Sequence, residues 1–300
     1  MFDPDYDLFL AIVEAGSISA AARARGLTTA ALSKRLARLE LRLSTRLIHR
    51  TTRRLVLTPA GRDLHDTLLP LRTALLEAEE RVGGGGGPPR GPLRITAPTS
   101  FGRMHVIPCL PAFIAAWPEV SLTVDLSDEF VDLLDGRCDL AIRIGARGGP
   151  LLGKGLVAHR LGTSRRVLCA APAYLDRFGA PADLADLAGH RLLATTSQLP
   201  WQLDGPEGTV TLAGQSHVRT NSSEVVRELA LGGCGIALRS LWDVGEALAA
   251  GTLRRILTEY EGSQDVGIFA VHAPLPAVPS RLRAMVDHLA AHLATVAALD

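Results

Sequence analysis

The first 62 residues hold the side chains best suited to binding a polyanion. They include 11 of the chain's 32 Lys and Arg residues but only 5 of its 31 Asp and Glu residues. The whole chain of 300 residues carries a net charge of only +1, so the remainder is acidic on balance. Basic charge that is concentrated in one segment attracts phosphate groups. The distribution therefore indicates a nucleic acid as partner of the N-terminal segment, which the net charge alone would not.

Within this segment, small and hydroxyl residues surround a single lysine at helical spacing. The set consists of Thr29, Ala30, Ser33 and Lys34. On an α-helix these positions share one face. Small side chains let a helix approach base edges in the major groove, and a lysine adds attraction to phosphates. We therefore predict that this face reads double-stranded DNA.

A second basic motif places Arg53 and Arg54 directly before the strand-like run 55–58. The pattern predicts a hairpin with arginines at its tip, the wing of a winged helix. Arginines there suit the phosphate backbone or a narrow minor groove. The alternative is a solvated basic turn, and the position behind the helical segment favours contact with DNA. Five other arginines are open to either interpretation: Arg23, Arg25, Arg38, Arg42 and Arg46.

Three short helices are expected to position these residues. Apolar residues at helical spacing give the first helix a buried side, and Gly16 ends it. Ser19 is expected to cap an alanine-rich second helix, and Gly26 with Leu27 forms a tight turn. Thr28 is expected to cap the third helix. Four leucines mark the core side of that helix: Leu32, Leu36, Leu39 and Leu43.

Residues 63–82 predict a linker helix with an apolar stripe. Its members alternate spacings of four and three: Leu64, Leu68, Leu71, Leu75, Ala78 and Val82. Such a heptad pattern is typical of a helix that pairs with another helix. Pro70 lies off the stripe and is expected to kink or split the helix. The stripe can pack on its own domain or on a second chain. Because the glycine- and proline-rich residues 83–92 predict a flexible hinge, we favour a dimer.

From residue 93 onward the pattern alternates between strands and helices. Strands are predicted at 93–97, 120–126, 139–144, 165–170, 190–195, 235–238 and 266–272. Helices are predicted at 101–117, 129–135, 172–178, 222–231, 240–250 and 279–297. This order is typical of an α/β domain, with the first three strands in a parallel sheet covered by helices on both faces.

Composition and motifs exclude several classes of protein. The chain is 47% hydrophobic and 21% charged, as in ordinary globular proteins, and no apolar run approaches the roughly 20 residues that span a bilayer. The N-terminus is acidic and lacks the features of a secretory signal. We therefore expect a cytoplasmic protein that does not engage a membrane. The four cysteines are far apart, which argues against a disulfide framework or a zinc site.

Motifs of enzymes are missing from the sequence. It contains no P-loop, nucleophile elbow or dinucleotide fingerprint. His288 and His292 lie four apart on a predicted helix, but no third metal ligand accompanies them. We therefore predict no catalytic residues, no metal and no cofactor.

The sequence resembles a known family, the LysR-type transcriptional regulators, in both its N-terminal and its C-terminal part. The N-terminal resemblance is carried by Phe9, Glu14 to Ser17, Ala20 to Ala22, Leu27, Ser33, Leu39–Glu40, Leu47, Arg50–Thr51, Leu57–Thr58 and Ala60–Gly61. The strand opening at Leu93, the run Ala97 to Ser100 and the segment Asp139 to Gly145 resemble the family's effector domain. Many members carry Gln and Pro where this chain has Thr29 and Ala30.

The resemblance implies the architecture of the whole chain. It implies a winged helix-turn-helix, all-α but for its wing, over 1–62, a dimerising linker helix over 63–82, the hinge over 83–92 and an effector domain over 93–300. The effector domain would resemble periplasmic binding proteins, with one subdomain at 93–162 and 268–300 and another at 163–267. The family further implies a tetramer on two DNA half-sites.

By the same resemblance a small molecule would bind between the two subdomains. Thr99 and Ser100 end one strand and open a helix, and Asn221 and Ser222 occupy the same position before a later helix. Two helix N-termini that face one cleft would favour an anion. The alternative interpretation of each pair is an ordinary helix cap. Positions at the ends of predicted strands add three weaker candidates: Ser127, Gly145 and Thr196.

The sequence thus predicts a DNA-binding transcription regulator with a small, anionic effector. The alternative is a solute-binding protein or an enzyme on the same α/β fold.

Overall fold

The computed structural model describes residues 3–50, 55–82, 87–146, 148–149, 155–196 and 198–296. The chain divides into two compact units, residues 1–87 and 88–300, and each is described by itself. No helix in the described ranges is long and apolar enough to cross a bilayer.

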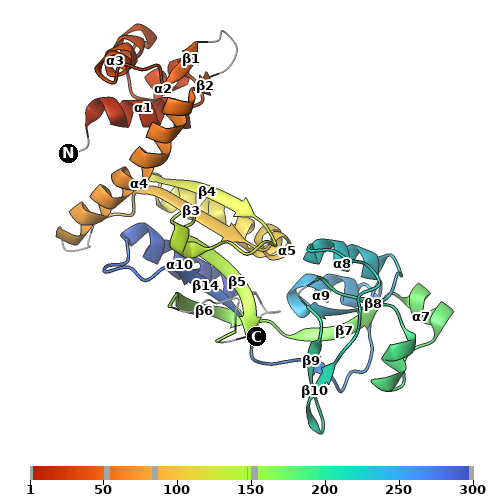
Figure 1. The fold of residues 1–300 in the computed structure, drawn as a ribbon. Helices are drawn as coiled ribbons and strands as arrows, with labels where there is room; N and C mark the ends of the chain where they lie inside the picture. The colour runs from red at the N-terminus through yellow and green to blue at the C-terminus, as the bar shows by residue number, and fades with distance from the viewer. Residues whose placement is uncertain are drawn as a thin grey trace. The chain divides into compact units, whose positions relative to one another are not determined.

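The N-terminal unit begins with three helices packed around one apolar core (Figure 1). They are α1 (Pro4–Glu14), α2 (Ile18–Ala24) and α3 (Thr29–Arg42). Leu8, Phe9, Ile12, Leu32 and Leu39 are fully buried in this core. The core side predicted for α3 is therefore confirmed at these positions.

The caps of these helices follow from local hydrogen bonding. Thr28 caps α3 as predicted, its Oγ1 accepting from the Ala31 N–H at 3.2 Å. The prediction for Ser19 was wrong, because Ser17 caps α2 and Ser19 lies in its first turn. Gly16 adopts φ +65° and turns the chain directly before Ser17. Ser17 is therefore the extended residue that precedes α2, and its Oγ accepts from the Ala20 N–H at 3.0 Å.

A short antiparallel hairpin and a long helix complete this unit. The hairpin joins β1 (Ile48–Arg50) to β2 (Leu55–Leu57), and α4 (Pro59–Val82) follows directly. The tip, residues 51–54, lies outside the described residues. Of the two outcomes expected at Pro70, a kink or a split, the split is wrong, because α4 is one continuous helix. Pro70 is exposed, so water can bond the carbonyl that the proline leaves unpaired.

The C-terminal unit contains two sheets, and we call the part around each sheet a lobe. Lobe 1 has a five-stranded sheet in the order β4-β3-β5-β14-β6. Its strands are β3 (Gly91–Ala97), β4 (Val120–Leu126), β5 (Leu140–Ala146), β6 (Val157–Thr163) and β14 (Val266–His272). The first three are parallel, as predicted, whereas β14 runs antiparallel to both β5 and β6.

The helices of lobe 1 differ in detail from the prediction. The predicted helix 101–117 is composite, built from α5 (Thr99–Phe101), η1 (Gly102–Val106), η2 (Ile107–Cys109) and α6 (Leu110–Ala116). The helix predicted at 129–135 is only the single turn η3 (Leu133–Asp135), which Asp132 caps and the left-handed Gly136 ends. Apolar residues of α10 (Ser280–Leu293) pack with the sheet in the core of the lobe.

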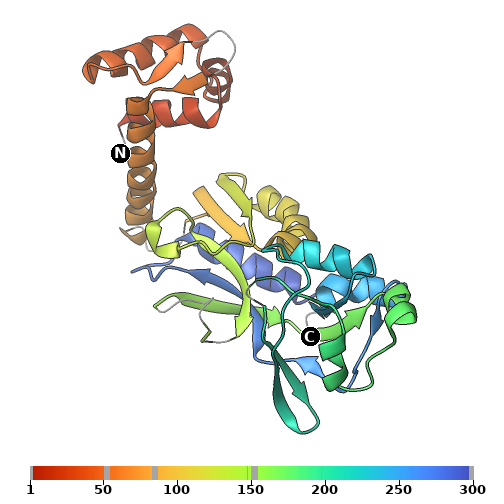
Figure 2. The same cartoon turned by 45° about the vertical axis from the view of Figure 1, so that its right-hand side comes forward.

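Lobe 2 is built on a more antiparallel sheet in the order β10-β9-β13-β7-β11-β8, with β12 beside β7. Its strands are β7 (Arg166–Ala170), β8 (Leu192–Leu193), β9 (Trp201–Gly205), β10 (Gly208–Leu212), β11 (Ile236–Ser240), β12 (Arg254–Arg255) and β13 (Glu261–Gly262). Its helices are α7 (Pro172–Phe178), η5 (Ala185–Gly189), α8 (Ser223–Leu231) and α9 (Leu241–Ala249). The β9–β10 hairpin projects from this lobe (Figure 2).

The chain passes between the lobes twice. It leaves lobe 1 after β6, crosses at Ser164 and Arg165, and enters β7. It returns from β13 through residues 263–265 into β14. Both crossings lie side by side, because the Ser164 N–H donates to the Val266 carbonyl at 3.0 Å.

Candidate DNA interface and effector pocket

The predicted reading face of α3 lies at the surface of the N-terminal unit. Thr29, Ala30 and Lys34 are exposed, and Ser33 is half-buried. Within the described part of the chain, no ion pair involves Lys34. The lysine charge is therefore available to an external anion.

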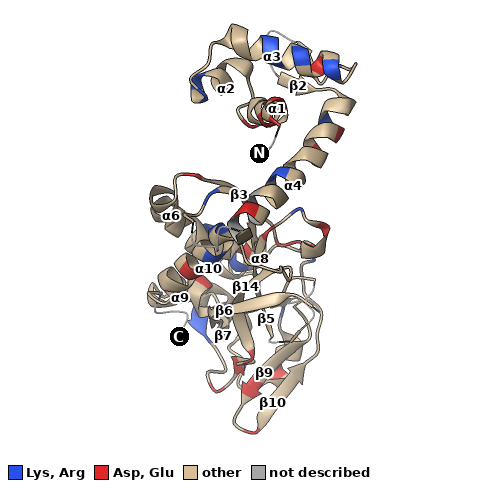
Figure 3. Ribbon diagram, turned by 90° about the vertical axis from the view of Figure 1, so that its left-hand side faces the viewer, with Lys and Arg blue, Asp and Glu red and all other residues tan. Residues whose placement is uncertain are grey.

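Three arginines on α3 are instead held by acidic residues at the start of α1. Arg35 and Arg38 both bond the Asp5 carboxylate, at 3.0 and 2.8 Å. Arg42 bonds Asp3 at 3.0 Å. Figure 3 shows the pattern, with basic positions along α3 and acidic positions on α1. These ion pairs attach α3 to α1, and they include Arg38 and Arg42, two of the five arginines that the sequence left open.

The pKa of Asp5 reflects this arrangement. Burial alone would raise the pKa of this carboxyl, but hydrogen bonds and charge from Arg38 and Arg35 outweigh burial and lower it. Asp5 therefore stays ionised and keeps both guanidinium groups in place at neutral pH.

Buried polar contacts fix the base of the hairpin. Glu40 is buried, and its Oε1 accepts from the N–H groups of Leu47 and Ile48 at 2.9 and 3.3 Å. Thr58 donates to the Arg46 carbonyl and accepts from the Gly61 N–H. The hairpin is thus held between α3 and α4. Arg53 and Arg54, predicted at its tip, lie outside the described residues.

The C-terminal unit contains a pocket of about 560 Å³ between the two lobes. Both lobes line it, which fits the usual location and size of a small-molecule site. Four of the predicted effector residues line this pocket: Ser100, Ser127, Gly145 and Asn221. Three others, Thr99, Thr196 and Ser222, do not, although their neighbours Thr195 and Ser223 do.

The three residues outside the lining have structural contacts. The Ser222 Oγ caps α8 by accepting from Val225 N–H at 3.5 Å. The Thr196 N–H donates to the Thr220 carbonyl at 2.9 Å. The Thr99 N–H donates to a carboxylate oxygen of Asp128 at 2.8 Å.

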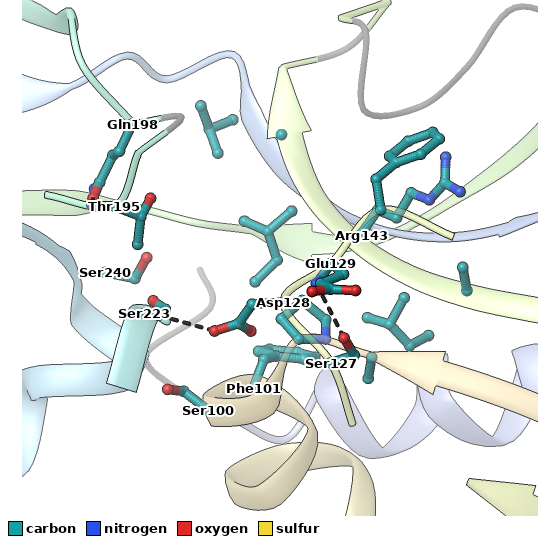
Figure 4. A pocket seen from close by; sticks show the side chains of 18 of the residues that line it. Ser100, Phe101, Ser127, Asp128, Glu129, Arg143, Thr195, Gln198, Ser223 and Ser240 are labelled. Carbon is teal, nitrogen blue, oxygen red and sulfur yellow. Dashed lines mark hydrogen bonds between the residues drawn. The ribbon is translucent and has the colours of Figure 1, made fainter. Parts of the chain in front are cut away.

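Asp128 is one of the pocket residues that the sequence analysis missed. Its second carboxylate oxygen accepts from the Ser223 N–H, at the start of α8, at 2.9 Å (Figure 4). The carboxylate therefore joins the first residue of α5 in lobe 1 to the first residue of α8 in lobe 2. The sequence signal that could have identified Asp128 as a pocket residue is its position just after the predicted strand 120–126.

Cationic side chains line another part of the pocket. Arg143 lies 4.3 Å from the centre of the Phe130 ring and donates to the Val131 carbonyl. Arg239 is buried and paired with Asp243. The Arg166 Nε is buried and has no hydrogen-bond partner among the described residues. Burial lowers the pKa of the Arg166 guanidinium, and the charge of Asp204 offsets this only in part.

Aromatic and hydroxyl contacts also connect the lobes. Trp242 of α9 packs edge-on against Phe101 and His105 of lobe 1, with ring centres 5.1 and 5.5 Å apart. Its indole N–H donates to Ser164 at the crossing, and Ser164 bonds Ser240 at 3.0 Å. The lobes therefore share a core beside the pocket.

The two histidines considered as metal ligands have other surroundings. The His288 Nε2 lies 2.9 Å from the Cys109 carbonyl, and its ring packs against Phe113. His292 lies in the last turn of α10. Among the described residues, no cluster of three or more His, Cys, Asp or Glu could hold a metal ion.

A helix-turn-helix with an exposed basic face, joined in one chain to a two-lobed α/β domain with an interlobe pocket, defines a ligand-responsive DNA-binding protein. Comparisons with known proteins agree. Residues 5–62 match the bacterial regulatory helix-turn-helix domain of the lysR family, and residues 86–294 match the LysR substrate binding domain. The chain belongs to the LysR family of transcriptional regulators and is not an enzyme.

Relatives of known name extend over nearly the whole chain. It is 34% identical over 294 residues to the HTH-type transcriptional regulator DmlR of Escherichia coli K12, covering 97% of this chain and 94% of that one. It is 34% identical over 291 residues to the E. coli K12 transcriptional activator TtdR, covering 96% and 92%.

Solved structures show the same organisation. The LysR-type regulator CrgA of Neisseria meningitidis aligns with a TM-score of 0.60 at 30% identity, covering 98% of this chain and 99% of that chain. Full-length AphB of Vibrio cholerae aligns with a TM-score of 0.58 at 26% identity, covering 96% and 98%. LysR regulators bind promoter DNA and small-molecule effectors and act as oligomers.

Proposed function

We propose that this regulator reads promoter DNA in the cytoplasm with the exposed face of α3. Thr29, Ala30 and Ser33 would approach base edges, while Lys34 would contact a phosphate. Arg53 and Arg54 would add wing contacts. The observation that carries the proposal is that Lys34 is exposed and outside the ion pairs that hold the α3 arginines to α1.

We further propose that a small anionic effector binds in the interlobe pocket. Ser100, Ser127, Gly145 and Asn221 would contribute, with Thr99, Thr196 and Ser222 supporting them through the backbone. The unpartnered Nε of Arg166 supports an anion, because a negative ligand would offset the cost of burying that charge. Binding would change how the oligomer engages DNA.

The oligomer proposed is a dimer formed through α4, assembled further into a tetramer on two half-sites. Its support is the exposure of Leu71 and Val82, at 55% and 90%, on the apolar stripe of α4. Large apolar side chains that are exposed on a helix stripe are typical of a helix-pairing surface.

A gel-shift titration tests the DNA contact. The full-length protein is titrated onto DNA from upstream of its own gene at several salt concentrations, beside Lys34→Ala. Loss of one phosphate contact should weaken binding and reduce the slope of log affinity against log salt by about 1. Arg137→Ala removes one exposed charge from the loop after η3 and should retain both affinity and slope. An unchanged slope for Lys34→Ala removes that lysine from the interface, and no salt-dependent shift with the folded wild type refutes the DNA-reading proposal.

A further inference from the structure

A carboxylate from outside the helix accepts a hydrogen bond at the start of α8, in addition to the ordinary cap of this helix. Ser222 already caps α8, and Glu224 lies in its first turn. The Asp128 carboxylate nevertheless comes from a different lobe, 95 residues away in sequence, to accept from the Ser223 N–H. An ordinary aspartate cap bonds an N–H two or three residues ahead. Asp128 therefore acts between lobes and is not a local cap.

The same carboxylate also serves lobe 1. Its other oxygen accepts from the Thr99 N–H, 29 residues away in sequence. Two backbone N–H groups from two lobes thus converge on one carboxylate, one on each oxygen. This is the geometry by which a protein binds a free carboxylate ligand.

A buried hydroxyl on α5, next in sequence to Thr99, lacks a partner. Ser100 is only 1% exposed, lines the pocket, and its Oγ has no hydrogen-bond partner among the described residues. Segments α5 and α8 are in contact, and Figure 4 shows the Ser100 side chain pointing toward the start of α8. A buried donor without an acceptor is unfavourable, because it has lost its hydrogen bonds to water. The site therefore has one donor more than Asp128 satisfies.

Asp128 lies on a segment that can release it. It is half-exposed and follows β4 in a stretch without regular structure before η3. Its neighbour Ser127 bonds the Glu129 N–H in a local turn that does not depend on Asp128. Withdrawal of the Asp128 side chain would break no strand pairing, since β4 ends at Leu126.

We propose that Asp128 is a tethered anion: its carboxylate occupies a carboxylate site made by Thr99 N–H, Ser223 N–H and Ser100 hydroxyl, and a carboxylate-bearing effector binds by displacing it. The proposal rests on the effector pocket proposed above. Two carboxylates cannot accept from the same two N–H groups, so effector binding and Asp128 docking exclude each other. The site is thus specific for a carboxylate, and Asp128 holds the lobes together when no effector is bound.

Acetate is a probe that needs neither DNA nor the native effector. Full-length wild type and Asp128→Ala are titrated at pH 7 with sodium acetate, against sodium chloride at equal ionic strength. The readouts are the thermal unfolding midpoint of the C-terminal unit and the tryptophan fluorescence, to which interlobe Trp242 contributes. Asp128→Ala should have a lower midpoint in chloride and recover it saturably with acetate, at an apparent affinity at least tenfold tighter than wild type.

Matched variants keep the outcome decisive. Glu129→Ala removes the adjacent carboxylate, which makes no hydrogen bond to either helix start in the described part of the chain, and should respond to acetate as wild type does. Adding Ser100→Ala to Asp128→Ala should weaken acetate binding severalfold. If Asp128→Ala does not fold, the isosteric Asp128→Asn should give the same gain, because an amide competes less well than a carboxylate for N–H donors.

Equal acetate responses of the Asp128 variant and wild type overturn the proposal, as does an equal gain in Glu129→Ala. Either result would leave the gel-shift test of DNA binding unaffected, so failure of this inference and failure of the proposed function remain distinguishable.

Discussion

Gly61, near the start of α4, is a residue whose absent side chain matters. A Cβ built there would lie 2.0 Å from the Leu47 carbonyl oxygen, and that carbonyl already accepts from the Thr58 N–H at 2.9 Å. The atoms that this Cβ would meet belong to the Leu47 backbone at the base of the hairpin, and backbone atoms cannot rotate away as a side chain can. The close approach of α4 to the hairpin therefore requires glycine.

Gly61→Ala should destabilise the N-terminal unit by about 1–3 kcal/mol, as overpacking of a closed contact does. Gly245 in α9 is a matched control, because nothing lies within 4 Å of its built Cβ. Gly245→Ala should stabilise the protein by about 0.5–1 kcal/mol through helix propensity. Urea unfolding of the full-length variants measures both. Equal effects of the two substitutions would show that the contact at Leu47 is unimportant.

At the residue scale, the sequence predicts which face of a helix is exposed better than it predicts which side chains bond each other. Helical periodicity was enough to place Thr29, Ala30 and Lys34 at the surface. It could not tell that Arg38 would pair with Asp5, because that pairing depends on how α1 packs against α3. Asp128 was missed for the same reason, since both of its hydrogen bonds join segments distant in sequence.

At the scale of elements, length and periodicity decided which predictions held. Amphipathic helices such as α3 and α10 and the buried strands of lobe 1 at 93–97, 120–126, 139–144 and 266–272 were predicted with small errors at their ends. The segment 129–135 was not, because Phe130 and Leu134 remain 59% and 64% exposed and never form the buried side of a helix. The strand predicted at 190–195 is only β8, two residues long, and five strands were not predicted: β6, β9, β10, β12 and β13. The antiparallel direction of β14 depends on the chain leaving lobe 1 and returning, and a local pattern carries no information about that.

A histidine pair joins two of these elements, β6 and β14. His272 is buried, its Nδ1 lies 2.7 Å from the Ala273 carbonyl, and its Nε2 lies 3.0 Å from the Nε2 of His159. Burial lowers the pKa of His272, the Ala273 carbonyl opposes this, and His159 lowers it further. His272 is therefore neutral in the folded protein at neutral pH.

This lowered pKa predicts acid sensitivity of lobe 1. Between the lowered folded pKa and the unfolded value of about 6.5, the unfolded chain binds more protons, so stability falls as the pH falls through that window. His272→Asn should flatten this dependence between about pH 7 and 5, measured by urea unfolding at each pH. Part should remain, because burial also lowers the pKa of His105. His217→Asn, at an exposed position, is the control; a wild-type slope in His272→Asn would contradict the assignment.

At the scale of the whole molecule, the burial of the stripe on α4 changes along the length of the helix. Leu68 is buried in the core of its own unit, and Leu64 packs against that core. Leu71 and Val82 are exposed. The two interpretations that the sequence left open are therefore divided along one helix: the first turns pack on the domain, and the later turns present apolar side chains outward. Dimerisation through the later turns stays a prediction.

Leu71→Asp tests that prediction without disturbing the core. Burying a leucine contributes about 1.5–3 kcal/mol, and a twofold interface would bury two copies, so the dimer dissociation constant should rise at least tenfold. Sedimentation velocity over a range of concentrations measures the change. Leu41→Asp is the control, because Leu41 is 79% exposed on α3 and lies outside the stripe. If Leu71→Asp associates as wild type does, packing of Leu64 and Leu68 on their own domain accounts for the stripe, and any dimer must form through another surface.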